Sequence, residues 1–174
     1  MKRVILITGG ERSGKSSYAE SLALSLSSNP VYIATAHIWD EEFKERVKIH
    51  QKRRGPQWTN IEEETQLSKC NIEGRCAVID CITLWLTNIS QPLIKNETFD
   101  VNQALETAKR ELDAFLNQYA TFILVTNEIG SGGVSANPMQ RRFTDLQGWV
   151  NQYIAQKADE VILMVSGIAV KIKG

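Results

Sequence analysis

A glycine-rich segment near the start of the chain, residues 9–16, constrains the fold more than any other feature of the sequence. It reads Gly9-Gly10-Glu11-Arg12-Ser13-Gly14-Lys15-Ser16 and fits the Walker A pattern G-x-x-x-x-G-K-[ST] at every position. An apolar segment typical of a strand precedes it, and a segment typical of a helix follows it, which is the context that this motif requires. The segment therefore predicts a strand, a phosphate-binding loop and a helix in succession.

The chemistry expected at this loop is the binding of a nucleoside triphosphate. Glycine allows the backbone to curl so that successive amide N–H groups point at phosphate oxygens, and the helix N-terminus adds a favourable dipole. Lys15 is predicted to reach the β- and γ-phosphates, and Ser16 is predicted to bind Mg²⁺ through its hydroxyl. The alternative is a glycine turn that holds no ligand, and the fit of all eight positions argues against it.

Short apolar segments alternate with helical patterns along the rest of the chain. The predicted strands are rich in Val and Ile without polar alternation, as in parallel strands covered on both faces; they span residues 4–8, 31–35, 77–80, 122–126 and 161–165. The predicted helices span residues 15–26, 41–53, 101–119 and 141–157. A tight Ser166-Gly167 turn then leads to a further strand over residues 168–173. The pattern predicts one α/β domain over residues 1–174, a P-loop NTPase-like three-layer fold whose mostly parallel sheet ends in an antiparallel hairpin strand.

Length, charge and cysteine content argue against several classes of protein. The 174 residues suit a single hydrophobic core. The 20 basic residues balance 20 acidic ones, so the basic excess of a general nucleic-acid-binding protein is missing. No apolar run approaches the roughly 18 residues needed to cross a bilayer. Three cysteines without a Cys-x-x-Cys pair favour a reduced, cytoplasmic protein.

A single acid, Asp80, is the candidate partner of the phosphate loop. It follows the apolar segment 77–79, and an acid at the carboxyl end of a buried strand can hold Mg²⁺ or its water, as a Walker B residue does. Ser16 and Asp80 are therefore the predicted metal ligands. The alternative is that Asp80 caps a helix that starts near Thr83, and both roles are compatible.

One of the two histidines, His50, has unusual surroundings. In a helix over residues 41–53 it shares a face with Phe43 and Val47, and Lys48, Lys52, Arg53 and Arg54 surround it. Such a histidine is usually a packed core or interface residue, and such cations usually form a solvated helix end. Cations nearby also favour the neutral, nucleophilic imidazole and attract phosphate, however. A nucleophilic histidine in a phosphate pocket suggests a covalent phosphoramidate step, because simple phosphoryl transfer does not need one.

These motifs together resemble those of the bifunctional adenosylcobinamide kinase / adenosylcobinamide-phosphate guanylyltransferase family. The resemblance runs from the first strand to the last residues. In the first half it rests on the phosphate loop and on the segments Tyr32-Ile33-Ala34-Thr35-Ala36 and Arg46-Val47-Lys48-Ile49-His50, the latter leading to Trp58. In the second half it rests on the segments 80–88 (DCITLWLTN), 125–130 (VTNEIG) and 165–173 (VSGIAVKIK).

The resemblance implies two reactions in cobalamin biosynthesis. Adenosylcobinamide is phosphorylated by ATP or GTP, and GTP then donates GMP to adenosylcobinamide phosphate, giving adenosylcobinamide-GDP and pyrophosphate. His50 is the position that would carry GMP covalently, with Lys15 as the second catalytic residue. Mg²⁺ is the implied cofactor, and the implied assembly is a homotrimer with the active site between subunits.

The resemblance also implies a set of nucleotide contacts. They fall on Gly9, Gly10, Glu11, Arg12, Ser13, Gly14, Lys15, Ser16, Ala34, Thr35, Ala36, Gln51, Lys52, Arg53, Arg54, Glu62 and Asp80. Family members often carry Ser at the position of Ala36 and Glu at that of Asp80. The first difference removes a hydroxyl contact, and the second shortens the acid by one methylene.

Three questions stay open at the level of the sequence. Glu128, at the carboxyl end of a predicted strand, is a candidate general base for the kinase step or a carboxylate that orders the loop beside Gly130. A second possible activity is that of another small P-loop kinase in which His50 is structural. A third possibility is a non-catalytic module whose partner binding depends on the γ-phosphate.

Overall fold

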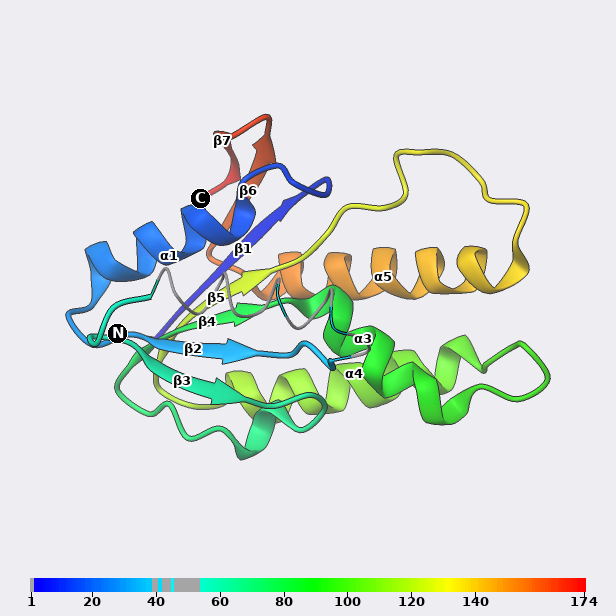
Figure 1. The fold of residues 1–174 in the computed structure, drawn as a ribbon, viewed down its shortest axis with the longest axis horizontal. Coiled ribbons are helices and arrows are strands. Elements are labelled where there is room, and N and C mark those ends of the chain that lie inside the picture. Colours follow the sequence, from blue (N-terminus) through cyan, green and yellow to red (C-terminus); the bar gives the residue numbers. More distant parts are fainter. Residues whose placement is uncertain (1, 39–40, 42–44, 46–53) are drawn as a thin grey trace.

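The computed structural model describes residues 2–38, 41, 45 and 54–174, and in this part of the chain seven strands form one sheet (Figure 1). They are β1 (Arg3–Gly9), β2 (Val31–Ala34), β3 (Thr59–Glu62), β4 (Cys76–Asp80), β5 (Thr121–Val125), β6 (Glu160–Val165) and β7 (Ile168–Lys173). Their order is β3-β2-β4-β5-β1-β6-β7, and all neighbours pair in parallel except β6 and β7, which are antiparallel. The predicted mostly parallel sheet with an antiparallel hairpin strand at its end is confirmed.

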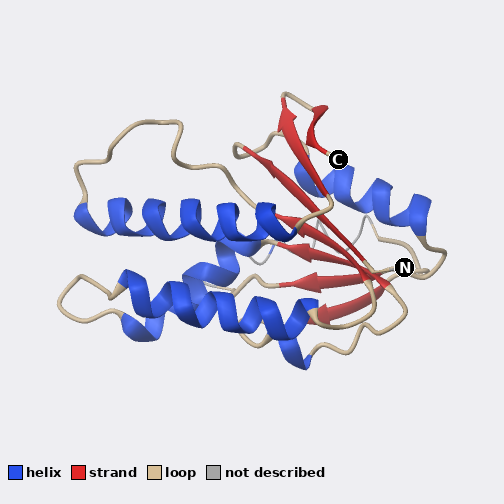
Figure 2. Cartoon of the chain, turned by 180° about the vertical axis from the view of Figure 1, so that it is seen from behind, coloured by secondary structure: helices blue, strands red, loops and turns tan. Residues whose placement is uncertain are grey.

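Helices cover both faces of this sheet. They are α1 (Lys15–Leu26), α3 (Ile82–Ser90), α4 (Val101–Leu116) and α5 (Pro138–Lys157), with short 3₁₀ helices η1 (Leu67–Lys69) and η2 (Gln91–Leu93). Figure 2, which shows the chain from behind, places α4 and α5 side by side across the sheet. Helix α1 packs on the opposite face, which gives the predicted three layers. The predicted helix over residues 41–53 lies almost entirely outside the described residues.

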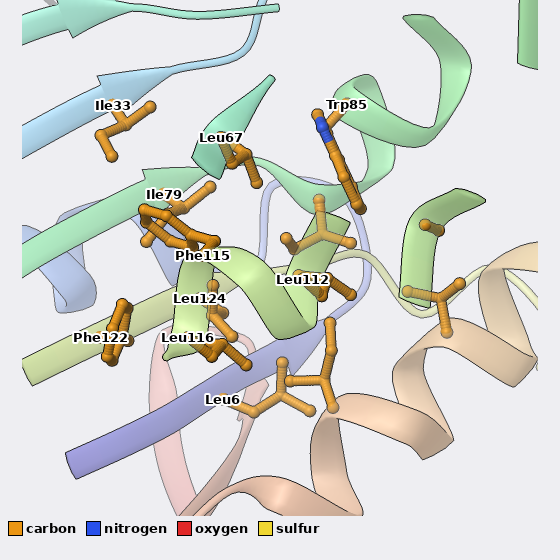
Figure 3. Close-up of a cluster of buried hydrophobic side chains, with 14 of the residues drawn as sticks. Leu6, Ile33, Leu67, Ile79, Trp85, Leu112, Phe115, Leu116, Phe122 and Leu124 are labelled. Atoms are coloured by element: carbon orange, nitrogen blue, oxygen red, sulfur yellow. The ribbon is translucent and has the colours of Figure 1, made fainter. Parts of the chain in front are cut away.

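The strands in the middle of the sheet are buried on both faces, which explains their continuous apolar sequences. In β1, Val4 and Leu6 face the helices α4 and α5, whereas Ile5 and Ile7 face α1. Figure 3 shows the first of these two cores, in which Phe115 and Leu112 of α4 lie against side chains of the strands. Phe115 meets Phe122 of β5 edge-on, with 5.2 Å between the ring centroids. A parallel strand covered by helices on both sides has no face left for polar residues.

The sequence did not predict β3, the edge strand that follows the segment containing His50. Its residues, Thr59-Asn60-Ile61-Glu62, are mostly exposed and form no apolar run, so the pattern that identifies buried strands is absent. β3 pairs in parallel with β2, Val31 lying opposite Thr59. Its presence extends the sheet and brings Glu62 to the same edge as the ends of β2 and β4.

Side-chain caps account for the starts of α4 and α5. Asp100 accepts a hydrogen bond from the amide of Gln103, and Asn137 accepts one from the amide of Met139. Pro138 occupies the first position of α5, so this helix starts three residues earlier than predicted. None of the helices in the described part of the chain is long and apolar enough to span a membrane.

Candidate nucleotide site

The phosphate loop connects the end of β1 to the start of α1 in a curled backbone path. Gly9 has a φ of 151° and Gly14 a φ of 95°, values that side-chain-bearing residues rarely adopt. A Cβ atom at Gly9 would lie 2.4 Å from the carbonyl oxygen of Met164, which leaves no room for a side chain. Gly14 is the N-cap of α1 and makes no side-chain cap, so the first turn of the helix begins directly at the loop.

Two neighbouring segments hold this loop in place. The amide of Gly167, in the turn between β6 and β7, donates to the carbonyl oxygen of Ser13 over 3.0 Å. The amide of Glu128, which follows β5, donates to the carbonyl oxygen of Gly9 over 3.0 Å. The loop is therefore supported by the strands on both sides of β1. The sequence pattern predicted the turn at Ser166-Gly167 but not its contact with the loop.

Lys15, the predicted phosphate-binding and catalytic cation, is buried at the base of the loop. Its Nζ donates to the carbonyl oxygen of Gly10 over 2.5 Å and lies 3.4 Å from the Ser13 hydroxyl. Burial lowers the pKa of Lys15, and the negative charges at Asp80 and Glu11 partly offset this effect. An ammonium group with few competing waters interacts strongly with an incoming anion, as phosphate binding requires.

The ends of three parallel strands bring other predicted residues together beside the loop. Ala34 of β2 lies opposite Glu62 of β3 on one side and opposite Asp80 of β4 on the other. Since β1 ends at the same edge of the sheet, residues 9–16, 34–36, 62 and 80 occupy one edge of the fold. In open α/β sheets, ligands bind at this carboxyl edge.

Asp80 is held by Tyr32, a residue to which the sequence assigned no role at the site. The Tyr32 hydroxyl donates to Oδ2 of Asp80 over 2.7 Å. The alternative role of Asp80 as the cap of α3 is wrong, because the N-cap is Cys81, whose sulfur accepts from the amide of Leu84 over 3.5 Å. The carboxylate therefore remains at the strand end, where its charge acts on the ammonium group of Lys15.

The hydroxyl of Thr35, a predicted nucleotide contact, is used within the protein. It donates to the carbonyl oxygen of Cys81 over 2.7 Å and accepts from the amide of the same residue over 2.8 Å. The carbonyl of Thr35 accepts from Asn88 over 2.7 Å. Thr35 is fully buried. Through these hydrogen bonds its hydroxyl joins the ends of β2 and β4 and fixes the backbone beside Asp80.

The donors at this edge fit a magnesium ion that is held largely by a nucleotide. In the described part of the chain, no group of three or more His, Cys, Asp or Glu side chains is placed to hold a metal ion. Mg²⁺ at a phosphate loop does not need such a group, because it takes one hydroxyl, one acid, phosphate oxygens and water. Ser16, in the first turn of α1, and Asp80 provide a hydroxyl and an acid.

The predicted residues around the histidine fall into two groups. His50, Gln51, Lys52 and Arg53 lie outside the described residues, so their roles stay predictions. Arg54 is described, and its guanidinium is buried, with the side chain 3% exposed. It stacks on the ring of Tyr32 at 3.6 Å from the centroid, and its Nε donates to Asn60 over 2.7 Å. The resemblance implies a nucleotide contact for Arg54, which stays a prediction, and the contacts that the structure shows for it lie within the protein.

Glu128, the candidate general base, orders the loop that follows β5. Its carboxylate accepts from the amides of Gly130 over 2.8 Å and Ser131 over 3.1 Å. Hydrogen bonds from Ser131 and Gly130 lower the pKa of Glu128, against a smaller opposing effect of burial. A carboxylate with a lowered pKa is a weak proton acceptor, so the structure favours the loop-ordering role.

Polar residues of α5, which no motif in the sequence indicates, anchor the strand end before Glu128. Gln147 donates to the hydroxyl of Thr126 over 2.9 Å, and that hydroxyl donates to Asn151 over 2.7 Å. The amide of Asn127 donates to the hydroxyl of Thr83 over 2.9 Å. Segments 80–88 and 125–130, which both carry the family resemblance, are thus joined by a hydrogen bond at the candidate site.

Comparison with solved structures supports the fold. A prototypical ATPase of the type III secretion system of pathogenic bacteria superposes with a TM-score of 0.60 at 9% identity, covering 94% of this chain and 52% of that one. At this identity the likeness shows the fold alone. The P-loop NTPase-like architecture predicted from the phosphate loop is therefore confirmed.

Comparison with known sequences identifies relatives that match nearly the full length of this chain. The bifunctional adenosylcobalamin biosynthesis protein CobP of Pseudomonas aeruginosa is 38% identical over 174 residues, covering 97% of this chain and 96% of that protein. The bifunctional adenosylcobalamin biosynthesis proteins CobU of Escherichia coli K12 and Salmonella typhimurium LT2 are 37% and 38% identical over 181 residues, each covering 98% of this chain and 99% of its relative. A family model described as cobinamide kinase / cobinamide phosphate guanyltransferase matches residues 5–172, from β1 to β7. The chain belongs to the cobinamide kinase / cobinamide phosphate guanyltransferase family.

Proposed function

We propose that this chain carries out two consecutive transfers in the biosynthesis of adenosylcobalamin. It phosphorylates adenosylcobinamide with ATP or GTP, and it then transfers GMP from GTP to adenosylcobinamide phosphate, giving adenosylcobinamide-GDP. The observation that carries this proposal is the family match over residues 5–172, which includes the phosphate loop, Asp80 and the position of His50. Residues 1–174 act in this proposal as one catalytic unit.

In the kinase step, a hydroxyl oxygen of adenosylcobinamide attacks the γ-phosphorus of the bound triphosphate. The bond between the γ-phosphorus and the bridging oxygen breaks, the nucleoside diphosphate leaves, and the hydroxyl proton passes to solvent or to a base. Amides of the phosphate loop orient the phosphates, and the buried ammonium of Lys15 stabilises negative charge on them. Positioning and charge stabilisation account for most of the catalysis in this kind of transfer.

In the guanylyl transfer, His50 is the proposed nucleophile. Its imidazole nitrogen attacks the α-phosphorus of GTP, pyrophosphate leaves, and a phosphoramidate forms. A phosphate oxygen of adenosylcobinamide phosphate then attacks the same phosphorus, which breaks the bond between phosphorus and nitrogen and restores the histidine. Gln51, Lys52 and Arg53 follow His50 in the chain, and the two cations among them can offset charge on the α-phosphate oxygens.

The other proposed contacts follow from the resemblance and from the edge of the sheet that carries them. The nucleotide contacts are those predicted above, with Ser16 and Asp80 as the residues that would hold Mg²⁺. When bound, Mg²⁺ would neutralise charge on the phosphate oxygens. The proposal further includes a cytoplasmic location and no nucleic-acid partner. It also includes a homotrimer with the active site between subunits, which light scattering of the purified protein would test.

A labelling experiment tests the proposed function. The protein is mixed with Mg²⁺ and with GTP labelled at either the α- or the γ-phosphate, denatured, and examined for bound label. We expect label only from the α position, labile in acid and stable in base, and absent from His50→Ala. His50→Ala should still phosphorylate adenosylcobinamide, since that step needs no covalent nucleotide.

Two results would contradict this proposal. Absence of retained label despite intact GTP binding would exclude the guanylyl-histidine and leave a plain P-loop kinase. Nucleotide binding without any turnover of adenosylcobinamide would instead support a non-catalytic module. The matched control for His50→Ala is His37→Ala, because His37 lies just beyond β2 and its ring pairs with Glu64 at 2.9 Å.

A further inference from the structure

A hydrogen bond between two side chains joins Tyr32 of β2 to Asp80 at the carboxyl end of β4. Tyr32 is 4% exposed, and its hydroxyl lies 2.7 Å from Oδ2 of Asp80. A phenol keeps its proton at neutral pH, so the Tyr32 hydroxyl acts as a hydrogen-bond donor to the carboxylate.

The ring of Tyr32 is held from two sides. The guanidinium carbon of Arg54 lies 3.6 Å from the ring centroid, and the Trp58 ring meets it edge-on, with 6.0 Å between the centroids and 79° between the planes. A cation over an aromatic face and an edge-to-face ring pair are both attractive arrangements. These contacts fix the direction in which the hydroxyl points.

Arg54 is itself fixed by its neighbours. Its Nε donates to Oδ1 of Asn60 in β3 over 2.7 Å, and its Nη1 lies 3.7 Å from a carboxylate oxygen of Glu20 in α1. The guanidinium therefore joins α1 and β3 above the Tyr32 ring. This cluster, which we call the Tyr32 clamp, consists of Tyr32, Arg54, Trp58, Asn60 and Glu20.

The clamp matters because Asp80 has a competing partner. Asp80 lies close enough to Lys15 for its charge to act on the ammonium group. Without a second partner, the carboxylate could turn towards Lys15 and occupy the cation that a triphosphate requires. The Tyr32 hydroxyl holds Oδ2 and leaves the other carboxylate oxygen for a metal ion or its water.

We propose that Tyr32 is a positioning residue that orients Asp80 for the metal–nucleotide complex, and that Arg54 and Trp58 hold Tyr32 in the required place. This inference rests on the proposed function, because it takes Asp80 as the acid beside the metal. Hydrogen-bond partners of metal-binding carboxylates typically change metal affinity by about 10- to 100-fold when they are removed.

The test compares metal-dependent and metal-free nucleotide binding. Tyr32→Phe keeps the ring for Arg54 and Trp58 and removes only the donor. We measure the Mn²⁺ concentration that half-saturates the binding of a fluorescent GTP analogue, and the affinity for the same analogue in EDTA. We expect Tyr32→Phe to raise the half-saturating Mn²⁺ concentration about tenfold. The affinity for the analogue in EDTA should change by less than about twofold, which is the usual size of the effect of a substitution that removes no important contact.

The chain offers a matched control, Tyr153→Phe. The Tyr153 hydroxyl also donates to a carboxylate, that of Asp113, at 2.7 Å, but this pair joins α5 to α4 on the face opposite α1. The same chemical change there should leave the Mn²⁺ requirement as in the parent protein. Asp80→Asn completes a double-mutant cycle, in which Tyr32→Phe should have no further effect once the carboxylate is gone.

The outcomes separate this inference from the proposed function. If Asp80→Asn raises the Mn²⁺ requirement and Tyr32→Phe does not, Tyr32 only packs and the positioning role is overturned. An equal loss of affinity in EDTA and in Mn²⁺ overturns it as well, since the effect is then not directed at the metal. If Asp80→Asn has no effect, the metal role of Asp80 fails and the inference fails with it, whereas the guanylyl-histidine is still tested by the α-phosphate label.

Discussion

The amide of Gly167, in the last turn of the chain, donates a hydrogen bond to the carbonyl oxygen of Ser13 in the phosphate loop, with 3.0 Å between nitrogen and oxygen. The two residues are close in a second way, because a Cβ atom placed on Gly14 would lie 3.4 Å from the Cα of Gly167. The hairpin of β6 and β7 therefore supports the phosphate loop from outside. This contact gives a structural reason for a Ser-Gly turn at the end of the chain.

Replacing Gly167 with Ala should weaken nucleotide binding. Gly167 has a φ of 82° and open space around its Cβ position, so the substitution introduces backbone strain of about 1–2 kcal/mol and no clash. We expect a similar loss in the free energy of unfolding, together with a several-fold lower GTP affinity measured by calorimetry.

Gly74→Ala is the matched control for this change. Gly74 has a φ of 73° and equally open surroundings, but it lies before β4, at the other end of that strand from Asp80. Gly74→Ala should lower the free energy of unfolding by the same amount as Gly167→Ala and leave the GTP affinity unchanged. Equal effects of both variants on affinity would show that Gly167 does not support the loop specifically.

Gly9→Ala should destabilise the protein much more than Gly10→Ala. At Gly9 the new Cβ would lie 2.4 Å from the Met164 carbonyl oxygen, whereas at Gly10 it meets nothing within 4 Å. We expect a loss of about 2–4 kcal/mol at Gly9, from strain and clash together, and of less than about 1 kcal/mol at Gly10. Urea titrations of both variants measure the difference, and equal losses would mean that the loop adjusts without cost.

Thr35→Val should be far more destabilising than Thr35→Ser. Valine keeps the shape but leaves both the amide and the carbonyl of Cys81 without the hydroxyl that binds them, at a cost of about 2–4 kcal/mol. Serine keeps the hydroxyl and loses one methyl group, which costs about 1 kcal/mol. If unfolding experiments show the two variants to be alike, the hydroxyl does not join the two strands as the hydrogen bonds indicate.

The buried cysteines predict a loss of stability at alkaline pH. Burial raises the pKa of the Cys76 thiol from 9.0 to about 11 in the folded protein. Since the unfolded chain loses this proton first, the stabilisation is present below pH 9.0 and disappears as the pH rises towards 11.

Cys76→Ala isolates this effect. Within that window, the free energy of unfolding of the variant should fall less steeply with pH than that of the parent protein, by about 1.4 kcal/mol per pH unit. Urea titrations at a series of pH values give both slopes. Identical slopes would mean that the Cys76 thiol ionises equally easily in both states.

Glu128→Gln should reduce the kinase activity only modestly. The carboxylate orders the Gly130 and Ser131 amides and has a lowered pKa, so we expect kcat to fall by less than about tenfold. Removal of a true general base costs about 10²- to 10⁴-fold. Steady-state kinetics with adenosylcobinamide decides between the two roles, and a loss in the larger range would assign the base to Glu128.

Local features of the sequence predicted most of the fold. Of the seven strands in the described part of the chain, six were predicted. Five of these have apolar segments without alternation, since burial on both faces excludes polar residues, and β7 follows the recognisable Ser-Gly turn of a hairpin. The exposed strand β3 carries no such signal and was not predicted. The alternative interpretation of Asp80 placed the start of α3 near the correct residue but gave it the wrong cap, because a cysteine is an unusual N-cap residue and an aspartate is a common one.

The sequence by itself determined the phosphate loop, because its glycines and its lysine act over a few neighbouring residues and leave a pattern in the chain. Only the tertiary structure decided which distant residues support that loop and the acid beside it. The contacts of Gly167 with Ser13 and of Tyr32 with Asp80 depend on the order β3-β2-β4-β5-β1-β6-β7 and on the directions of side chains across it. A hydrogen bond between strands far apart in the chain depends on distance in space, which no spacing along the sequence records.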